Sequence, residues 1–237
     1  HMDGRHRESC ARKIVADLAR RAYRRPPTTQ EVSQLLTLFS TARKEGDSFE
    51  EGLCVALQAM LVSPHFLFRV ERDDSLAGVD AAAAHQVNQH ELASRLSYFL
   101  WASMPDPELM KLAKAGELGR PPVLEAQVRR MLGDPKAYNL VDNWAAQWLQ
   151  LRNLGRTKPD PTRFPKVDDE LLDAMRTETS MFIEAIIKED RSILDIIDAP
   201  FTFLNGPLAR HYGIKGVDGE QFQRVTLDGA QRSGVLT

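Results

Sequence analysis

Apolar side chains recur every three or four residues along most of this chain, which is the spacing of one face of an α-helix. The first row follows Ser9 and contains Ala11, Val15 and Leu18. Further rows of this kind lie near residues 32–39, 53–61, 92–100, 124–132, 140–149 and 169–189. The pattern therefore predicts an all-α fold in which the helices form multi-helix, bundle-like blocks.

Helix-capping residues precede several of these rows. In a capping box, a short polar side chain and a Glu three residues later bond each other's backbone N–H groups at the start of a helix. The sequence has three such pairs, which are Thr28 with Glu31, Ser48 with Glu51 and Asn88 with Glu91. Two short helices are also predicted, from Asp106-Pro107 to Gly116 and from Asn205 to Gly213.

A short pattern occurs twice, as MLVSP at residues 60–64 and as MLGDP at residues 131–135. In each copy a row of apolar positions ends, and Ser63 or Asp134 offers an oxygen to free backbone N–H groups. Pro64 or Pro135 then stands at the first helical position, where its missing N–H costs nothing. We interpret both copies as sharp corners between two helices. An ancient duplication is the alternative, and the differing flanking residues argue against it.

Residues with β propensity gather in the tail, as QFQRVTL and SGVLT, and they are too few for a sheet of their own. We therefore expect a short irregular or β C-terminal tail. Residues 72–87 and the proline-containing stretch 152–167 are typical of linkers. They divide the chain into three predicted blocks, which are 9–71, 88–151 and 168–237.

Composition places the chain among ordinary globular proteins, with 237 residues, 43% hydrophobic and 27% charged. A formal net charge of -2 argues against a dedicated nucleic-acid-binding protein. No apolar run approaches the roughly 18 residues of a membrane span. His1 and Met2 are typical of residues left by a cloning vector, and a trimmed chain would have lost any signal peptide.

Two charged segments invite a functional interpretation. Residues 1–26 hold eight basic residues against three acidic ones, and residues 168–198 hold ten acidic residues against three basic ones. The first faintly resembles a helix-turn-helix region, but RPPTTQ makes a poor recognition turn. The second lacks the Glu-x-x-His pairs of a di-metal site. We interpret both segments as solvent- or partner-facing helix surfaces.

Five residues are candidates for ligand binding, which are His65, His211, Trp101, Trp144 and Trp148. Trp144 and Trp148 are one helical turn apart, so they share a face that could meet a sugar or a haem. That face also includes Leu140 and Val141, and core packing is therefore the favoured interpretation. No nucleophile elbow, phosphate loop or dinucleotide fingerprint is present, so no catalytic, cofactor-binding or metal-binding residue is assigned.

Cysteine use is sparse, with Cys10 and Cys54 and no CxxCH motif. This chain therefore attaches no c-type haem of its own. A disulfide between the two cysteines is one alternative. The favoured alternative is that Cys54 is a buried free thiol on a helix.

Long stretches of the sequence resemble known families. They are ARKIVADLARRAYRRPPTTQEV with FEEGLCVALQAMLVSPHFLFRVE, then ELASRLSYFLWASMPDPELMKLA with VDNWAAQWLQLRNL, then RSILDIIDAPFTFLNGPLARHYGI with RSGVLT. Together they resemble three consecutive domain-of-unknown-function families, the last of them truncated. Such families occur in large, secreted, cytochrome-c-linked proteins of planctomycetes, acidobacteria and myxobacteria.

This resemblance implies a periplasmic or secreted protein in which a haem c domain lies outside the present chain. Partners would be other domains of the same protein, including that cytochrome domain. The resembled proteins often carry a further cysteine upstream, so Cys10 would have lost its natural partner and would be an accessible thiol. The resemblance supplies no reaction and no catalytic residue.

Two functions follow as expectations. The first is a non-catalytic structural or interaction module of an extracytoplasmic protein that carries a c-type cytochrome. The alternative is an oxidoreductase that passes electrons to the attached cytochrome and acts on carbohydrate-derived substrates. A deep pocket with converging polar groups would favour the enzyme, and a flat surface would favour the module.

Overall fold

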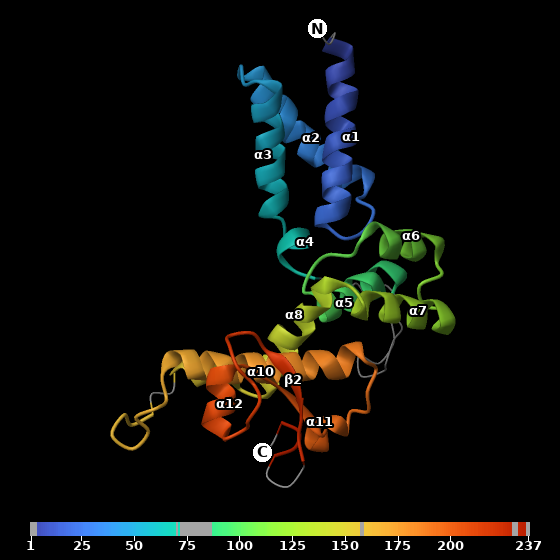
Figure 1. Ribbon diagram of the computed structural model, residues 1–237. Coiled ribbons are helices and arrows are strands. Elements are labelled where there is room, and N and C mark those ends of the chain that lie inside the picture. The colour runs from blue at the N-terminus through green and yellow to red at the C-terminus, as the bar shows by residue number, and fades with distance from the viewer. Residues whose placement is uncertain (1–3, 70, 72–86, 157–158, 229–231, 236–237) are drawn as a thin grey trace, which may run out of the picture. The chain divides into compact units, whose positions relative to one another are not determined.

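The computed structural model describes residues 4–69, 71, 87–156, 159–228 and 232–235, with side chains from Glu8 onward (Figure 1). Helices dominate this described part of the chain, and a small antiparallel sheet lies near its C-terminal end. The mostly α-helical fold with a short β tail is therefore confirmed. The predicted linker at 72–87 lies outside the described residues, apart from residue 87.

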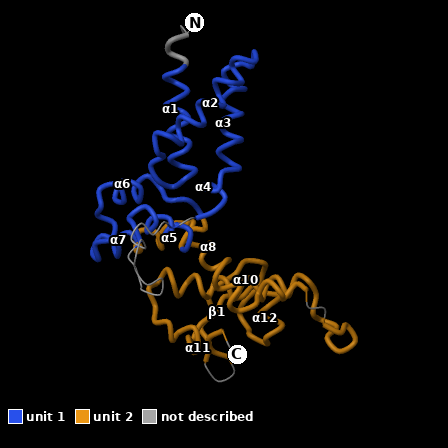
Figure 2. Tube along the Cα trace, turned by 180° about the vertical axis from the view of Figure 1, so that it is seen from behind, with its two compact units in different colours: residues 1–99, 103–127 blue, residues 100–102, 128–237 orange. Residues whose placement is uncertain are grey.

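The chain forms two compact units (Figure 2). Unit 1 contains residues 1–99 and 103–127, and unit 2 contains residues 100–102 and 128–237. The chain first passes from unit 1 to unit 2 inside one helix, α5, at Leu100. The boundaries of these two units differ from those of the three blocks expected from the sequence. The three blocks stay a prediction.

The first part of unit 1 is a group of three long helices and one short one. They are α1 (Gly4–Ala22), α2 (Thr29–Lys44), α3 (Phe49–Leu61) and α4 (Pro64–Leu67). Figure 1 shows the three long helices side by side, and each contacts the other two. Their shared core consists of Ala11, Val15, Ala19, Tyr23, Leu35, Phe39, Ala56 and Met60. Gly52 permits the close approach of α3 to α2, since a Cβ there would lie 2.9 Å from the ring of Phe39.

Unit 1 continues through α5 (Gln89–Trp101), α6 (Pro107–Ala115) and the first part of α7 (Pro121–Leu132). The predicted ends of α6 are confirmed. Asp106 accepts the backbone N–H of Leu109, and Gly116 adopts a left-handed conformation with φ 72°. The side chain of Gln89 accepts the backbone N–H of Gly119 at 2.9 Å, which connects the start of α5 to the turn before α7.

After the last residues of α5 and α7, unit 2 continues with a helical run in short pieces. They are η1 (Pro135–Ala137), α8 (Tyr138–Leu140), the π turn η2 (Val141–Ala145), α9 (Ala146–Trp148) and η3 (Leu151–Arg156). The helix predicted at 140–149 is therefore present, but a π turn interrupts it. The long helix α10 (Asp169–Lys188) matches its predicted position at 169–189.

The remainder of unit 2 is α11 (Asp195–Asp198), β1 (Phe201–Leu204), α12 (Gly206–Tyr212) and β2 (Gln223–Thr226). β1 and β2 pair in antiparallel register, with Phe201 opposite Thr226 and Leu204 opposite Gln223. The expectation that only the tail carries β structure is wrong, because FTFL forms the other strand. Its four residues give too weak a local signal, and pairing with a segment about 20 residues later stabilises the strand.

Both predicted corners are confirmed. The side chain of Ser63 accepts the backbone N–H of His65 at 3.3 Å, and Asp134 accepts that of Lys136 at 2.8 Å. Each proline stands in the first turn of the next helix. All three capping boxes also form, and in the third Asn88 and Glu91 exchange bonds of 3.0 Å.

The cysteine expectations are partly wrong. Cys10 and Cys54 are both free, so the disulfide alternative is excluded. Cys54 is exposed rather than buried, because α3 turns its small residues Gly52 and Ala56 toward α2 and α1 instead. Cys10 is half-buried.

Candidate functional site

A cavity of about 640 Å³ opens in unit 1. Its walls are the end of α1, the turn at residues 24–28, four residues after α3 (His65, Phe68, Arg69 and Glu71), and the first turns of α5. Most of its lining side chains are polar or charged, and four of them are arginines. Segments far apart in the sequence thus bring converging polar groups to one hollow, which makes it the best candidate for a functional site.

Arg24 fixes the wall of the cavity next to α4. It follows the last turn of α1 and has a positive φ of 57°. The guanidinium donates hydrogen bonds to the backbone carbonyls of His65 at 2.8 Å and Phe68 at 2.9 Å. It is 7% exposed and also lies over the ring of Tyr98, with 5.8 Å to the ring centroid. These contacts fix the backbone that carries His65.

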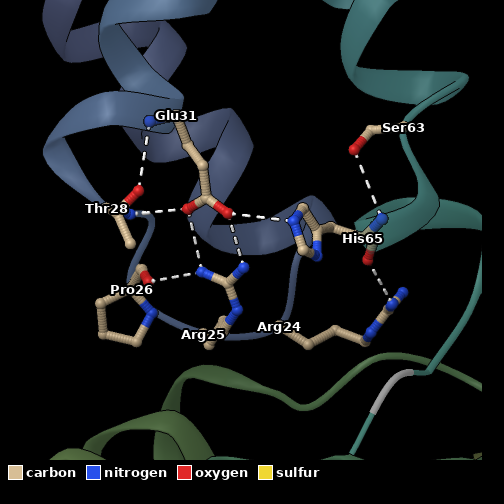
Figure 3. Close-up of polar contacts among 7 residues, drawn as sticks. All are labelled: Arg24, Arg25, Pro26, Thr28, Glu31, Ser63 and His65. Atoms are coloured by element: carbon tan, nitrogen blue, oxygen red, sulfur yellow. Dashed lines mark hydrogen bonds and ion pairs between the residues drawn. The ribbon is translucent and has the colours of Figure 1, made fainter. Parts of the chain in front are cut away.

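Next to it, Arg25, Glu31 and His65 form a connected polar group (Figure 3). Arg25 donates to both carboxylate oxygens of Glu31, at 2.7 and 3.0 Å, in the paired geometry that arginine favours. Glu31 also accepts the backbone N–H of Thr28 at 2.7 Å, completing the capping box of α2. The Nε2 atom of His65 lies 3.3 Å from the same carboxylate.

The electrostatics of this group keep Glu31 ionised. The hydrogen bonds from Arg25, aided by the backbone N–H of Thr28, lower the pKa of Glu31 from an ordinary 4.5 to about 2. The same ion pair raises the pKa of Arg25. A carboxylate with so low a pKa is a poor proton acceptor near neutral pH, so Glu31 is suited to positioning its neighbours rather than to general base catalysis.

The first turns of α5 supply the opposite wall. The Nε2 atom of His90 is buried and has no hydrogen-bond partner among the described residues. Burial, opposed by the nearby Glu91 and aided by Arg25, lowers the pKa of His90 below its ordinary 6.5, so its imidazole is neutral near pH 7. Further along, Arg95 forms a two-pronged ion pair with Glu71, in which Nε lies 2.5 Å from Oε1. Arg69 lies over the ring of Tyr98, with 4.7 Å to its centroid.

Of the five residues singled out from the sequence, only His65 lines this cavity. Trp101 is 1% exposed, and its indole nitrogen donates to the carbonyl of Met131 at 2.9 Å, so it belongs to the interior of unit 2. Lys136 lies over its ring at 4.9 Å. His211 is exposed in the last turn of α12, with its ring 5.5 Å from that of Tyr212.

Trp144 and Trp148 lie together, but the expectation that they pack in the core is wrong. They are 44% and 54% exposed, and their rings stack with centroids 5.4 Å apart and planes 19° apart. The buried positions of this run are instead Leu140, Val141, Ala145 and Ala146. The π turn widens the helix at this point, so the residues that face the core are not those a regular helix would select.

The other polar residues of the cavity were not identified from the sequence. Arg24 and Arg25 were counted as part of an exposed basic segment, and Glu31 as a helix cap. His90 was one of several isolated histidines without ligand spacing. The pattern RRPPTxxE, in which an arginine pair precedes a capping box, is the local signal that could have indicated the Arg25–Glu31 pair.

These observations define the class of the protein. It is mostly helical and has two units, and arginines and histidines line a cavity in the first unit. The chain belongs to the PSD4 family, a protein family of unknown function (DUF1592), whose model matches residues 87–214. The model of PSD5, a second family of unknown function (DUF1595), matches residues 10–71. The cavity draws its walls from both matched regions. No curated protein and no solved structure matches the chain.

Two features, a metal-binding cluster and a membrane-spanning helix, are absent from the described part of the chain. It has no group of three or more His, Cys, Asp and Glu residues arranged to bind a metal ion. Nor does any helix within it combine the length and the apolar character that crossing a lipid bilayer requires.

Proposed function

We propose that this chain is a non-catalytic interaction module of a longer, periplasmic or secreted protein that carries a c-type cytochrome domain. Its partners are then other domains of the same protein, the cytochrome domain among them, and haem c is bound outside this chain. Two consecutive matches to families of unknown function support a multidomain parent of the kind that the sequence resembles.

This proposal rests on one observation, which is that most charged groups of the cavity are bonded to other groups of the protein. Arg24 is bonded to backbone carbonyls, Arg25 to Glu31, and Arg95 to Glu71. Such mutual pairing fixes the shape and charge of a surface, which is what recognition requires. Acid–base catalysis instead needs a group whose pKa lies near the working pH, and Glu31 is far from that range.

One observation favours the alternative, in which the chain is part of an oxidoreductase that acts on carbohydrate-derived substrates and passes electrons to the attached cytochrome. The candidate site is a hollow with converging polar groups and not a flat surface. Within it, His90 offers a buried nitrogen with no protein partner among the described residues. A substrate could use that nitrogen.

The test uses the full-length, haem-containing parent protein and a His90→Ala variant of it. Haem reduction is followed by absorbance while neutral sugars, sugar acids and small organic acids are added. The module proposal expects any reduction of the haem to proceed at the same rate in both proteins. A compound that reduces the wild-type haem, and does so at least about tenfold more slowly in the variant, would establish the oxidoreductase instead.

A further inference from the structure

We propose that the cavity of unit 1 binds a small organic oxyanion. Its anionic group would lie against Arg69 and Arg95, and a hydrogen-bonding group elsewhere in the molecule would reach His90. This goes beyond the interaction role proposed above, because it assigns a small-molecule ligand to the cavity.

The lining of the cavity has a small surplus of positive charge. Four arginines line it, against two glutamates of the lining and the adjacent Glu31, although the whole chain has a net charge of -2. All three glutamates are already engaged. Glu31 is paired with Arg25, Glu71 accepts from Arg95, and Glu91 belongs to the capping box of α5. The surplus is therefore available to an anion that enters from solution.

Two of the arginines in the lining have N–H donors that no carboxylate of the described residues uses. Arg69 has a cation–π contact with Tyr98, and it has no carboxylate partner among the described residues. Arg95 uses Nε and one terminal nitrogen on Glu71, which leaves its other terminal nitrogen to donate. A guanidinium presents parallel N–H groups in a planar fork, and this fork matches the oxygens of a carboxylate, sulfate or phosphate group.

His90 lines the cavity, and its Nε2 atom has no hydrogen-bond partner among the described residues. A buried nitrogen without a hydrogen bond costs free energy. Because the imidazole is neutral, Nε2 can accept from a hydroxyl or donate to an oxygen, depending on its tautomer. A purely inorganic anion bound at Arg69 would leave this atom unsatisfied, so the ligand should have an organic part.

The cavity is preformed, and its volume suits a small molecule. The bonds from Arg24 to the carbonyls of His65 and Phe68 fix one wall, and the capping boxes at Thr28 and Asn88 fix two others. A volume of about 640 Å³ lies within the ordinary range for small-molecule sites, roughly 300–1,000 Å³. It is larger than an inorganic ion needs.

The experiment is a titration followed by NMR of the histidine side chains in the purified chain. The probes are glucose, glucuronate, glucose 6-sulfate and glucose 6-phosphate, at constant ionic strength set with sodium chloride. They share one neutral scaffold, so differences among them report on the anionic group. We expect saturable shifts of the His90 signals with at least one of the three anions and none with glucose.

Variants locate the site. Arg69→Gln should weaken binding about tenfold or more, since it removes a charge-assisted contact, and Arg69 is exposed, so the fold should persist. His90→Ala, followed by the signals of His65, should weaken it as well. Arg210→Gln, which removes an exposed arginine on α12 in unit 2, is the matched control and should leave the affinity unchanged.

The result that would overturn the inference is the absence of saturable shifts with all three anions, or saturable binding that Arg69→Gln leaves intact. This outcome is separable from the test of the module proposal. If anions bind and haem reduction depends on His90, the proposed ligand class stands, and the chain is part of an enzyme and not a non-catalytic module. If neither anion binding nor haem reduction that depends on His90 is observed, the module proposal stands and the proposed ligand is wrong.

Discussion

At the scale of single residues, Glu31 shows how one side chain serves several purposes. It completes the capping box of α2, pairs with Arg25 and lies beside His65. Its pKa is lowered to about 2, chiefly by the hydrogen bonds from Arg25. An acid whose pKa is lower in the folded state stabilises the fold above its unfolded pKa, and this contribution disappears as pH falls toward the folded pKa.

The change Glu31→Gln keeps a side chain that can cap the helix but removes the charge. We expect it to lower the free energy of unfolding at pH 7 by about 2 kcal/mol, since charge-assisted hydrogen bonds are lost. The difference from wild type should stay constant down to about pH 5 and shrink between pH 4.5 and pH 2. Urea unfolding at a series of pH values measures it.

Glu51→Gln is the matched control for that prediction. Glu51 completes the equivalent capping box of α3, and the bonds from Ser48 lower its pKa, while no arginine of the described residues is paired with it. A loss of stability at pH 7 as large as that of Glu31→Gln would show that helix capping, and not the pair with Arg25, determines the effect.

The two cysteines give a second prediction at this scale. Cys54 is exposed and Cys10 is half-buried, and neither is in a disulfide. We expect the folded protein to react with a chromogenic thiol reagent in two phases, a fast one from Cys54 and a slower one from Cys10. Cys54→Ser should abolish the fast phase. Persistence of that phase in the variant would mean that Cys10 is the accessible thiol.

At the scale of elements, the run from Tyr138 to Trp148 shows how a local departure from the α-helix changes which side chains are buried. The π turn at Val141–Ala145 directs Val141 and Ala145 to the core with Phe182 and Ile183 of α10. Trp144 and Trp148 stack on the surface instead. The same residues in a regular helix would present a different face.

A pair of tryptophan variants tests this arrangement. Trp148→Ala should change the stability by less than about 1 kcal/mol, because its ring is more than half exposed. Trp101→Ala should cost about 3–5 kcal/mol, because it removes a buried large aromatic side chain and its hydrogen bond to Met131. Thermal melts compare the two. Equal losses would indicate that Trp148 is buried in solution.

A buried polar network joins three elements of unit 2. The carboxyl group of Glu178 in α10 accepts from the hydroxyl of Thr202 in β1 at 2.6 Å and from that of Tyr212 in α12 at 2.9 Å. Burial raises the pKa of Glu178 despite these bonds and the nearby Arg232. Burial also raises the pKa of Tyr212, with the Glu178 carboxylate adding to the effect. The network specifies where β1 and α12 pack on α10.

At the scale of the whole molecule, the chain forms two units with separate cores. The core shared by α1, α2 and α3 lies in unit 1, and the cores built on α10 lie in unit 2. All three tryptophans belong to unit 2. Tryptophan fluorescence therefore reports on unit 2, while far-UV circular dichroism reports on the helices of both units.

This division predicts which unfolding signal each variant moves. Tyr212→Phe should lower the fluorescence midpoint in urea, because it removes one of the bonds to the buried Glu178, worth about 1–3 kcal/mol. Glu31→Gln should shift part of the circular dichroism transition and leave the fluorescence midpoint in place. Tyr138→Phe, which removes an exposed hydroxyl, is the control. A fluorescence midpoint that Glu31→Gln lowers as far as Tyr212→Phe would show that the two units unfold as one.

The sequence by itself determined the features that depend on neighbours within a few residues. The capping boxes at Thr28, Ser48 and Asn88, the proline corners at Ser63 and Asp134, and the left-handed glycine at Gly116 are all placed as predicted. Each is a contact between residues at most four positions apart, so the local sequence contains both partners. The mostly helical class follows for the same reason.

Tertiary structure alone decided which residues meet across long separations. The strand β1 depends on β2, the exposure of Cys54 depends on how α3 packs, and the exposure of Trp144 and Trp148 depends on a π turn. The cavity joins Arg25, His65 and His90, which are far apart in the chain. Burial and pairing are set by the elements that surround a residue. The sequence alone does not show those neighbours, so in it the cavity residues are an ordinary charge and two isolated histidines.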